Sequence, residues 1–303
     1  MLVTHGSPGP AGPSALTVGN FDGVHRGHRA LLDRVDAAAR KLGIASCVLT
    51  FEPHPREFFA PDQAPPRLTR LRDKLELIAA AGIDRVHVAR FDARFAALPA
   101  ERFIEEVLVR GLAVRWMMVG RDFRFGARRA GDFALLERAA ARHGFALEAM
   151  PDVEFEGKRV SSSAVRGALQ AGALRHAERL LGHPYCISGR VAHGAKLGRS
   201  LGFPTANLVL RRAPPLSGIF VVEAGALGNG VASLGRRPTV NPVPVPLLEV
   251  HLFDRQEDLY GEHLKVRFLE KLRDEEKYDD LDALKKAIAG DARRAREYFG
   301  NHG

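Results

Sequence analysis

The first regular segment of the chain runs into a turn rich in glycine and histidine: Leu16-Thr17-Val18-Gly19-Asn20-Phe21-Asp22-Gly23-Val24-His25-Arg26-Gly27-His28. An apolar run, residues 15–18, precedes the turn, and an amphipathic helix pattern follows it, with Leu31, Val35 and Leu42 on one stripe. A strand, a tight turn and a helix N-terminus in this order suit phosphate, because backbone N–H groups and the positive helix end face the ligand. The segment therefore predicts a nucleotide-binding site.

Two histidines, His25 and His28, add hydrogen-bond donors at the mouth of this turn. A single histidine beside a helix start is most often exposed or a local cap. The spacing His-x-Gly-His directly after Gly-Asn-Phe-Asp-Gly favours a functional pair that works on phosphate. A zinc site is the other interpretation, and we reject it because no Cys or His pair at zinc-finger spacing accompanies them.

Length and composition limit the classes of protein. The 303 residues suffice for two domains, and they contain no run of about eighteen apolar residues that would span a membrane. Residues 1–14 are rich in Gly and Pro, so we expect a flexible N-terminus and not a signal peptide. Cys47 and Cys186 lie far apart, which argues against a disulfide framework and favours the reducing cytoplasm.

The net charge of +9 suits either nucleic acid or anionic small molecules. The basic residues are spread along the chain in short pairs such as Arg128-Arg129, without the aromatic-studded basic strand of an RNA-binding sheet. We therefore expect small-molecule substrates, and neither a nucleic-acid nor a membrane partner. The sequence leaves the oligomeric state open.

Strand and helix patterns alternate from residue 15 to about 150. Strands are expected at 15–18, 44–51, 86–91, 114–119 and 145–150, and helices at 71–81, 99–111 and 133–142. This alternation predicts an α/β domain with a Rossmann-like parallel sheet and helices on both faces. Ligands of such sheets bind beyond the carboxyl ends of the strands, where the histidine motif lies.

Two further loops leave strands at that edge. Residues 50–55 carry two prolines that stiffen the loop, and residues 120–126 combine aromatic rings with the carboxylate of Asp122. Rings and polar groups that converge on one mouth suit a flat heteroaromatic ligand. Simple packing of each phenylalanine under its own loop is an equally good interpretation.

A serine cluster precedes the next helix pattern. Capping of the helix explains one of the three serines, Ser161, Ser162 and Ser163. Three hydroxyls followed by Arg166 exceed what a cap requires, and the same arrangement would clamp the phosphates of a triphosphate.

The pattern changes after a helix at 173–181. Short apolar segments bounded by Gly and Pro follow at 187–191, 218–222, 231–234, 247–253 and 264–268, and a last helix is expected at 280–298. They predict a compact antiparallel barrel or sandwich. The domains are therefore expected at residues 15–183 and 184–303.

The informative stretch of the second domain is residues 194–207, where glycines recur every fourth position with cations between them. Gly189 and Gly194 have Walker A spacing, but Ala195-Lys196 follows where Lys-Ser/Thr is needed. This excludes a Walker A loop and leaves a glycine-rich flap over a nucleotide. Thr205 and Asn207 offer neutral oxygens on one side of an extended chain, which suits Mg²⁺ on ATP phosphates. Glu249, on an apolar strand, is either an outward-facing residue or a general base for a substrate hydroxyl.

From about residue 15 onward, the chain resembles the prokaryotic bifunctional riboflavin kinase/FAD synthetase family. The resemblance rests on an ordered set of segments: 19–28, 50–55, 120–126, 161–166, 194–207, 248–249 and 258–261. Ser233 and Arg236 depart from the family pattern, in which Asn and Thr are usual.

The resemblance implies two consecutive reactions. The C-terminal half, an antiparallel β-barrel with a terminal helix, would phosphorylate riboflavin with ATP and Mg²⁺ to give FMN. The N-terminal nucleotidyltransferase domain would transfer AMP from a second ATP to FMN, giving FAD and pyrophosphate. ATP, riboflavin and FMN are then substrates, and Mg²⁺ is the cofactor.

The resemblance also implies roles for individual residues. The catalytic residues would be His25, His28 and Glu249. ATP at the adenylyltransferase site would contact Gly19, Asn20, Phe21, Asp22, Gly27, Ser161, Ser162, Ser163 and Arg166. The flavin there would contact Phe51, Pro53, His54, Asp122 and Phe123. ATP at the kinase site would contact Gly194, Lys196, Gly198 and Thr205, and Mg²⁺ would bind Thr205 and Asn207.

Two other classes of function compete with this interpretation. One is an adenylyltransferase for a different phosphorylated cofactor precursor, with the barrel as a binding module; the sequence Pro-Thr-Ala-Asn at 204–207 together with Glu249 argues against it. The other is a non-catalytic flavin- or RNA-binding regulator, which would bind its ligand without consuming ATP.

Overall fold

The computed structural model describes residues 1–9, 11–193, 202–237, 245–255 and 259–302. The chain forms two compact units, the first made of Met1–Pro65 and Leu71–Val160, the second of Pro66–Arg70 and Ser161–Gly303. The expected glycine-rich flap, with Gly194, Lys196 and Gly198, lies outside the described residues, as does most of the proline-dense stretch at 241–246.

The first unit alternates strands and helices as the sequence predicts. Its strands are β1 (Leu2–His5), β2 (Ser14–Val18), β3 (Ala45–Glu52), β4 (Arg85–Arg90), β5 (Val114–Gly120), β6 (Ala146–Met150), β7 (Glu154–Phe155) and β8 (Lys158–Arg159). Its α-helices are α1 (Arg26–Leu42), α2 (Pro55–Phe59), α3 (Leu71–Ala79), α4 (Ala93–Ala96), α5 (Ala100–Arg102) and α6 (Phe133–His143). The short 3₁₀ segments are η1 (Pro61–Gln63) and η3 (Ala127–Arg129), and η2 (Phe103–Gly111) is a π-helix.

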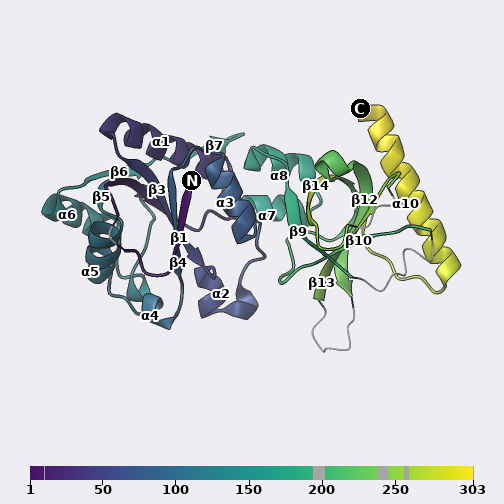
Figure 1. Ribbon diagram of the computed structural model, residues 1–303, viewed down its shortest axis with the longest axis horizontal. Coiled ribbons are helices and arrows are strands. Elements are labelled where there is room, and N and C mark those ends of the chain that lie inside the picture. Colours follow the sequence, from purple (N-terminus) through teal and green to yellow (C-terminus); the bar gives the residue numbers. More distant parts are fainter. Residues whose placement is uncertain (10, 194–201, 238–244, 256–258, 303) are drawn as a thin grey trace. The chain divides into compact units, whose positions relative to one another are not determined.

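Six of these strands form one sheet in the order β1-β4-β3-β2-β5-β6, and every pairing in it is parallel. Figure 1 shows these strands in the middle of the unit with helices around them. The chain moves outward from β2 through β3 to β4 and then crosses to β5 on the other side of β2. The strand order therefore reverses beside β2, and the turn that follows β2 lies at the switch point where α/β sheets bind ligands.

Both faces of the sheet are buried, so neighbouring strand residues enter different clusters. Ala15 packs in a cluster with residues of α1 and α3, whereas Leu16 packs in a second cluster with residues of η2 and α6. The same alternation recurs at Val48 and Leu49 on β3. A strand buried on both faces reads as a continuous apolar run, which is why β2 and β3 were recognisable in the sequence.

The expectation of a flexible segment at residues 1–14 does not hold near its start, where four residues form a strand. Leu2–His5 forms the edge strand β1, which pairs in parallel with β4. The Thr4 hydroxyl and His87 Nδ1 lie 2.8 Å apart, and His87 Nε2 lies 3.0 Å from the carbonyl oxygen of Gly6. A carbonyl only accepts, so His87 Nε2 donates to Gly6 and Nδ1 accepts from Thr4. The buried imidazole of His87 thus fixes a strand too short to show a period of its own.

The second unit contains a closed antiparallel barrel with strand order β10-β13-β12-β11-β14-β9. Its strands are β9 (Cys186–Ala192), β10 (Ala206–Val209), β11 (Gly218–Glu223), β12 (Asn229–Arg237), β13 (Val245–Leu252) and β14 (His263–Arg273). The other elements are α7 (Ser162–Gln170), α8 (Leu174–Leu181), the 3₁₀ turn η4 (Gly225–Leu227) and the terminal helix α10 (Leu281–His302). The predicted barrel and terminal helix are confirmed, and closure decides against the sandwich.

Helices cover the barrel from two segments of the chain. Helix α8 packs against β14, and α10 packs against β11, β12 and β14 (Figure 1). Ala292 and Ala295 of α10 are buried in a cluster with Val221 and Val231. The boundary expected near residue 184 lies just before β9, whereas the compact second unit already begins at Ser161 and also includes Pro66–Arg70. The division of function near residue 184 stays a prediction. Among the described residues, no helix is both long and apolar enough to cross a membrane.

The role of the unexpected strand β1 can be tested through its side-chain hydrogen bond. Replacing Thr4 by Val leaves His87 Nδ1 without its donor, so we expect the free energy of unfolding of the first unit to fall by about 1 kcal/mol. Thr4→Ser keeps the hydroxyl and serves as the control. Urea unfolding followed by fluorescence of Trp116, the single tryptophan, measures this unit. Equal losses in both variants would contradict the role given to the hydroxyl.

Candidate functional sites

The two histidines of the first unit lie together at the start of α1. His25 is the N-cap residue, and its Nδ1 accepts a hydrogen bond from the backbone N–H of His28 at 3.3 Å. The two rings stack with centroids 3.7 Å apart and an interplanar angle of 15°. A Cβ atom at Gly27 would lie only 3.2 Å from the His25 ring, so glycine gives this ring its room. Because Nδ1 of His25 accepts, its proton is on Nε2.

Several buried polar atoms around this turn have no hydrogen-bond partner within the described part of the chain. They are Thr17 Oγ1, Asn20 Oδ1 and His28 Nδ1. Nearly all buried polar groups in native proteins are hydrogen-bonded, to the protein itself, to water or to a ligand. Their clustering at the switch point of the sheet indicates that a bound ligand or ordered water completes them.

His28 is held in its neutral form. Burial is the largest cause that lowers its pKa well below the ordinary value of 6.5, and electrostatic interactions with His25 and Lys74 lower this pKa further. Its ring also lies 5.0 Å from the ring of Phe21, which is fully buried. A neutral imidazole donates through one nitrogen and accepts through the other, which suits hydrogen bonding to phosphate oxygens.

Lys74 is a residue of this site that the sequence analysis missed. It lies on α3, its side chain is buried, and its Nζ donates to Thr50 Oγ1 at 3.4 Å. The Thr50 hydroxyl in turn donates to the carbonyl oxygen of Asn20 at 3.3 Å. The available signal was its position on the apolar stripe of the helix, three residues after Leu71 and four before Ile78.

The remaining predicted residues of the turn are structural neighbours of the histidines. Phe21 and Asp22 are buried, and the backbone N–H of Gly19 donates to the carbonyl oxygen of Leu49 at 3.0 Å. Phe21 has a positive φ of 49°, a conformation that non-glycine residues rarely adopt. The turn is therefore tightly fixed between β2 and α1.

The loop after β3 combines packing with exposed aromatic surface. The half-buried ring of Phe51 contacts Phe91 edge-on, with centroids 5.8 Å apart. His54 caps α2, since its Nδ1 accepts from the N–H of Arg56 at 3.1 Å, and Pro53 lies directly before it. Sequence reasoning missed Phe59, which follows in α2, contacts Phe91 and leaves 66% of its side chain exposed. This loop therefore presents an aromatic surface to solvent.

The loop after β5 also contains both buried and exposed residues. Phe125 is buried, and the half-buried Phe123 stacks on it with centroids 5.4 Å apart. Asp122 is exposed and forms a 3.1 Å ion pair with Arg159. Arg159 lies on β8, part of a two-stranded hairpin that the sequence analysis did not predict.

The serine cluster belongs to the second unit. Ser161 is the N-cap of α7, where its hydroxyl accepts from the N–H of Ala164 at 3.2 Å, so the capping interpretation holds for this serine. Ser162 and Ser163 begin the helix, and Arg166 Nε donates to the carbonyl oxygen of Pro66 at 2.7 Å. A joint role of this cluster with the histidines stays a prediction.

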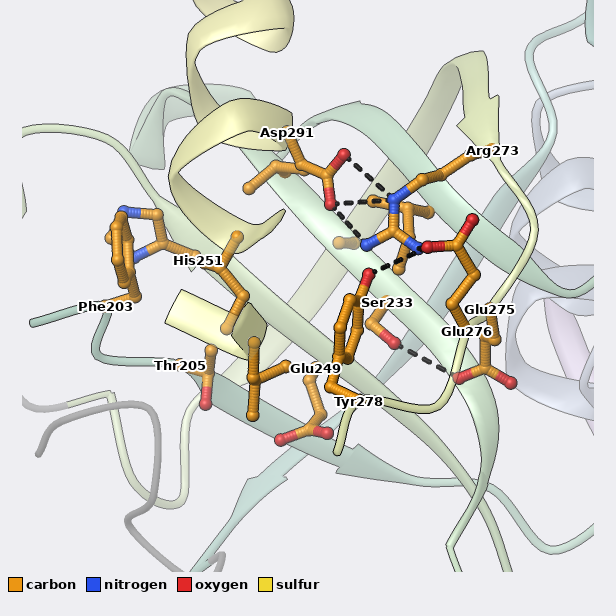
Figure 2. Close-up of a pocket in the computed structure, with 15 residues that line it drawn as sticks. Phe203, Thr205, Ser233, Glu249, His251, Arg273, Glu275, Glu276, Tyr278 and Asp291 are labelled. Atoms are coloured by element: carbon orange, nitrogen blue, oxygen red, sulfur yellow. Dashed lines mark hydrogen bonds and ion pairs between the residues drawn. The ribbon is translucent and has the colours of Figure 1, made fainter. Parts of the chain in front are cut away.

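Two of the predicted residues of the second site, Thr205 and Glu249, line a pocket in the barrel (Figure 2). Thr205, Ser233 and Glu249 line it as polar residues, and Phe203, Ile219 and Val231 contribute apolar surface. The terminal helix α10 lines the pocket with Leu284, Ile288 and Asp291, and the segment after β14 adds Glu275, Glu276 and Tyr278. The pocket therefore suits a ligand that combines a flat apolar ring with a polar chain.

Barrel register brings the polar residues of this site into one row. Asn207 on β10 is paired with Glu249 on β13, and Glu249 is paired with Ser233 on β12. The row continues from Ser233 to Ile219 on β11 and from Ile219 to Arg273 on β14. Directly opposed residues of antiparallel strands have Cβ atoms roughly 5 Å apart on the same face of the sheet. We call this set of five residues the barrel row.

Asn207 has the properties of a cation ligand. It is buried, and its Oδ1 has no hydrogen-bond partner among the described residues. Its Nδ2 donates to the carbonyl oxygen of Thr205 at 3.2 Å, which leaves Oδ1 as the group for a ligand. A neutral oxygen beside the Glu249 carboxylate and the Thr205 hydroxyl fits Mg²⁺, which prefers oxygen ligands.

A second carboxylate approaches Glu249. Ser233 Oγ donates to Glu275 Oε1 at 3.3 Å. Burial is the main cause that raises the pKa of Glu275; the hydrogen bond from Ser233 lowers it, and the negative charge of Glu249 raises it. Ser233 thus connects the barrel row to the segment after β14.

Comparisons with known proteins assign a family to each half. A family model described as FAD synthetase matches residues 9–164, and one described as riboflavin kinase matches residues 181–299. Curated relatives named bifunctional riboflavin kinase/FMN adenylyltransferase match nearly the whole chain. The relative from Escherichia coli (strain K12) is 51% identical and covers 97% of this chain and 95% of its own length.

Two further matches also span nearly the whole chain. A relative of the same name from Pseudomonas fluorescens is 49% identical, with 92% of this chain and 91% of the relative covered. Among solved structures, one described as a macrolide-efflux protein from Streptococcus pneumoniae aligns with a TM-score of 0.81 and 28% identity, covering 98% of this chain and 99% of that one.

The lowered pKa of His28 predicts a pH dependence of stability. Below about pH 6.5 the unfolded chain binds a proton at His28 that the folded chain does not bind, so the free energy of unfolding falls as the pH falls. For one such group the slope reaches about 1.4 kcal/mol per pH unit. We expect His28→Gln to flatten the dependence between pH 7.5 and 5, measured by urea unfolding and Trp116 fluorescence.

Comparison of the wild type with His28→Gln isolates the contribution of His28 to this pH dependence. His87, whose pKa is also lowered, chiefly by burial, is present in both, so its contribution cancels. Parallel pH dependences in the wild type and the variant would show that His28 is not kept neutral by the fold.

Proposed function

Because the chain belongs to the bifunctional riboflavin kinase/FMN adenylyltransferase family, we propose that its two sites divide the two reactions. Riboflavin and ATP are converted into FMN and ADP at the barrel pocket. FMN and a second ATP are converted into FAD and pyrophosphate at the histidine turn of the first unit. The main support for the proposal is the barrel row, in which Glu249 is paired directly with Asn207.

At the barrel pocket, Glu249 takes the proton from the ribityl 5′-hydroxyl as its oxygen attacks the γ-phosphate of ATP. The carboxylate is suited to this role because it lines the pocket and is fixed by strand pairing on both sides. A general base must lie within hydrogen-bond distance of the hydroxyl, and a rigid strand supplies that precision.

Asn207 and Thr205 hold Mg²⁺ in this proposal. The support is the unpartnered buried Oδ1 of Asn207, with Thr205 held next to it through its backbone carbonyl. When bound, Mg²⁺ neutralises negative charge on the ATP phosphates. Gly194, Lys196 and Gly198 stay predicted as ATP contacts of the kinase site.

At the histidine turn, the FMN phosphate attacks the α-phosphate of ATP and pyrophosphate leaves. His25 and His28 donate hydrogen bonds to the phosphate oxygens, and the buried Lys74 adds positive charge nearby. No covalent intermediate is required, since positioning and preorganised donors are sufficient for phosphoryl-group transfer. Asn20 and the α1 N-terminus bind ATP, and a phosphate-binding role of Ser161, Ser162, Ser163 and Arg166 stays a prediction.

The flavin of this reaction lies on the aromatic loops. Phe51, Pro53 and His54 lead into α2, where the exposed ring of Phe59 supplies a surface for a flat ring system. Asp122 and Phe123 form the corresponding part of the loop after β5. Both loops leave carboxyl ends of strands in the same sheet, which supports a single binding face. With these small-molecule substrates, the cytoplasm is the compartment that we propose.

Mutation should separate the two activities. In His28→Ala, FAD formation should fall by about 10²–10³ while FMN accumulates from riboflavin, because one charge-stabilising donor is lost. In Glu249→Gln, FMN formation should fall by about 10²–10⁴, while added FMN is still converted into FAD. Chromatographic separation of the flavins after incubation with ATP and Mg²⁺ measures both.

Each variant carries its own control, since the unaffected reaction reports that the chain is folded. Loss of both reactions in one folded variant would refute the assignment of one site to each half. A wild-type chain that forms neither FMN nor FAD would refute the proposed function itself.

The metal role of Asn207 predicts a shift in Mg²⁺ dependence. We expect Asn207→Ala to raise the Mg²⁺ concentration for half-maximal FMN formation at least tenfold, because a ligand oxygen is lost. Asn229→Ala, at an exposed position on β12, is the control. Initial rates across a Mg²⁺ series at fixed ATP give the value, and an unchanged half-maximum in Asn207→Ala would contradict this role.

A further inference from the structure

Arg273, the last residue of the barrel row, donates hydrogen bonds to several neighbouring groups. Its Nε donates to both carboxylate oxygens of Asp291 at 3.1 Å, and its Nη2 donates to Asp291 Oδ2 at 2.7 Å. Its Nη1 donates to the carbonyl oxygen of Asp274 at 3.0 Å. Figure 2 shows this guanidinium between the carboxylate of Asp291 and the segment of Glu275, Glu276 and Tyr278.

Asp291 comes from a different part of the chain, the terminal helix. Only 3% of the residue is exposed, and it also accepts a hydrogen bond from Arg294 on the next turn of α10. The desolvation cost of a buried carboxylate is offset only when charged partners satisfy it. Two arginines do so here, and one of them is a wall residue of the barrel pocket.

The arginine also organises the segment after β14. Its guanidinium lies 5.8 Å from the centre of the Tyr278 ring and 3.7 Å from Glu276 Oε2. The Tyr278 hydroxyl donates to the same Glu276 oxygen at 3.2 Å. Arg273, Glu276 and Tyr278 all line the pocket, so the position of this guanidinium sets the shape of one pocket wall.

We propose that Asp291 of the terminal helix is a positioning residue for the kinase reaction, which orients the Arg273 guanidinium so that this wall of the pocket binds riboflavin. The inference rests on the proposed function, since it assigns riboflavin to this pocket. Carbonyl oxygens of the isoalloxazine ring accept hydrogen bonds, and a guanidinium fixed by a bidentate carboxylate presents its remaining N–H groups in one plane. Asp291 acts through Arg273 and does not touch the substrate.

A purely structural role of Asp291 would be to anchor α10 to the barrel, and the chain offers a matched pair for comparison. Arg296 of the same helix donates two hydrogen bonds of 2.9 Å to Asp254 and lies over the Phe253 ring. This pair is exposed, and neither Arg296 nor Asp254 is among the residues that line the pocket. It anchors α10 without reaching the pocket.

The experiment uses the full chain with Asp291→Asn, Arg273→Lys and the control Arg296→Gln. KM for riboflavin, KM for ATP and kcat of FMN formation are measured, together with the rate of FAD formation from added FMN. We expect Asp291→Asn and Arg273→Lys each to raise KM for riboflavin about tenfold or more, because a displaced binding group loses its geometry. KM for ATP and the rate of FAD formation should stay within about twofold.

The control separates positioning from anchoring. We expect Arg296→Gln to leave KM for riboflavin unchanged. The inference is overturned if Arg296→Gln raises this KM as much as Asp291→Asn does, or if Asp291→Asn lowers thermal stability and kcat with no change in KM. Should Asp291→Asn not fold, Arg273→Lys decides alone, and an unchanged KM in that variant also overturns the inference. Wild-type FMN formation tests the proposed function separately.

Discussion

The antiparallel register of the closed barrel is the constraint on which the second site depends. Opposed pairing across five strands brings Asn207, Glu249, Ser233 and Arg273 into one row, although they lie far apart in the sequence. A slip of one residue would turn any of these side chains to the other face of its strand. Closure prevents such a slip, because each strand is hydrogen-bonded on both sides. The backbone thereby sets the relation between the proposed general base, Glu249, and the proposed metal ligand, Asn207.

The first site uses a different device, a helix N-terminus at the point where the strand order reverses. His25 serves both as the cap of α1 and as a partner for the ring of His28, so helix initiation and the arrangement of the imidazoles are one interaction. Burial keeps His28 neutral, and unpartnered atoms such as Asn20 Oδ1 remain for a ligand. The capping interpretation therefore holds for His25, and a function of the histidine pair in phosphate binding stays a prediction.

The predictable parts of the fold are those in which apolar residues recur at a regular spacing along the chain. The strand-turn-helix at residues 15–42 and the short barrel strands could be recognised because burial on one or both faces shows directly in the residue pattern. The edge strand β1 was missed because four residues after the first Met are too few to show a period. Lys74 and the Arg273–Asp291 pair were missed for another reason. Apart from the place of Lys74 on the apolar stripe of α3, nothing in their own segments marks these residues. Only tertiary packing shows that Lys74 and Asp291 are buried and that Arg273 lies beside a site.

The central proposal is that the barrel row, together with Thr205, carries out phosphoryl transfer to a flavin hydroxyl. A crystal structure of the chain with riboflavin, ADP and Mg²⁺ tests it most directly. The account predicts the cation at roughly 2.1 Å from the side-chain oxygens of Asn207 and Thr205, with the ribityl 5′-oxygen within hydrogen-bond distance of Glu249. A cation bound elsewhere, or a ribityl chain directed away from Glu249, would contradict it.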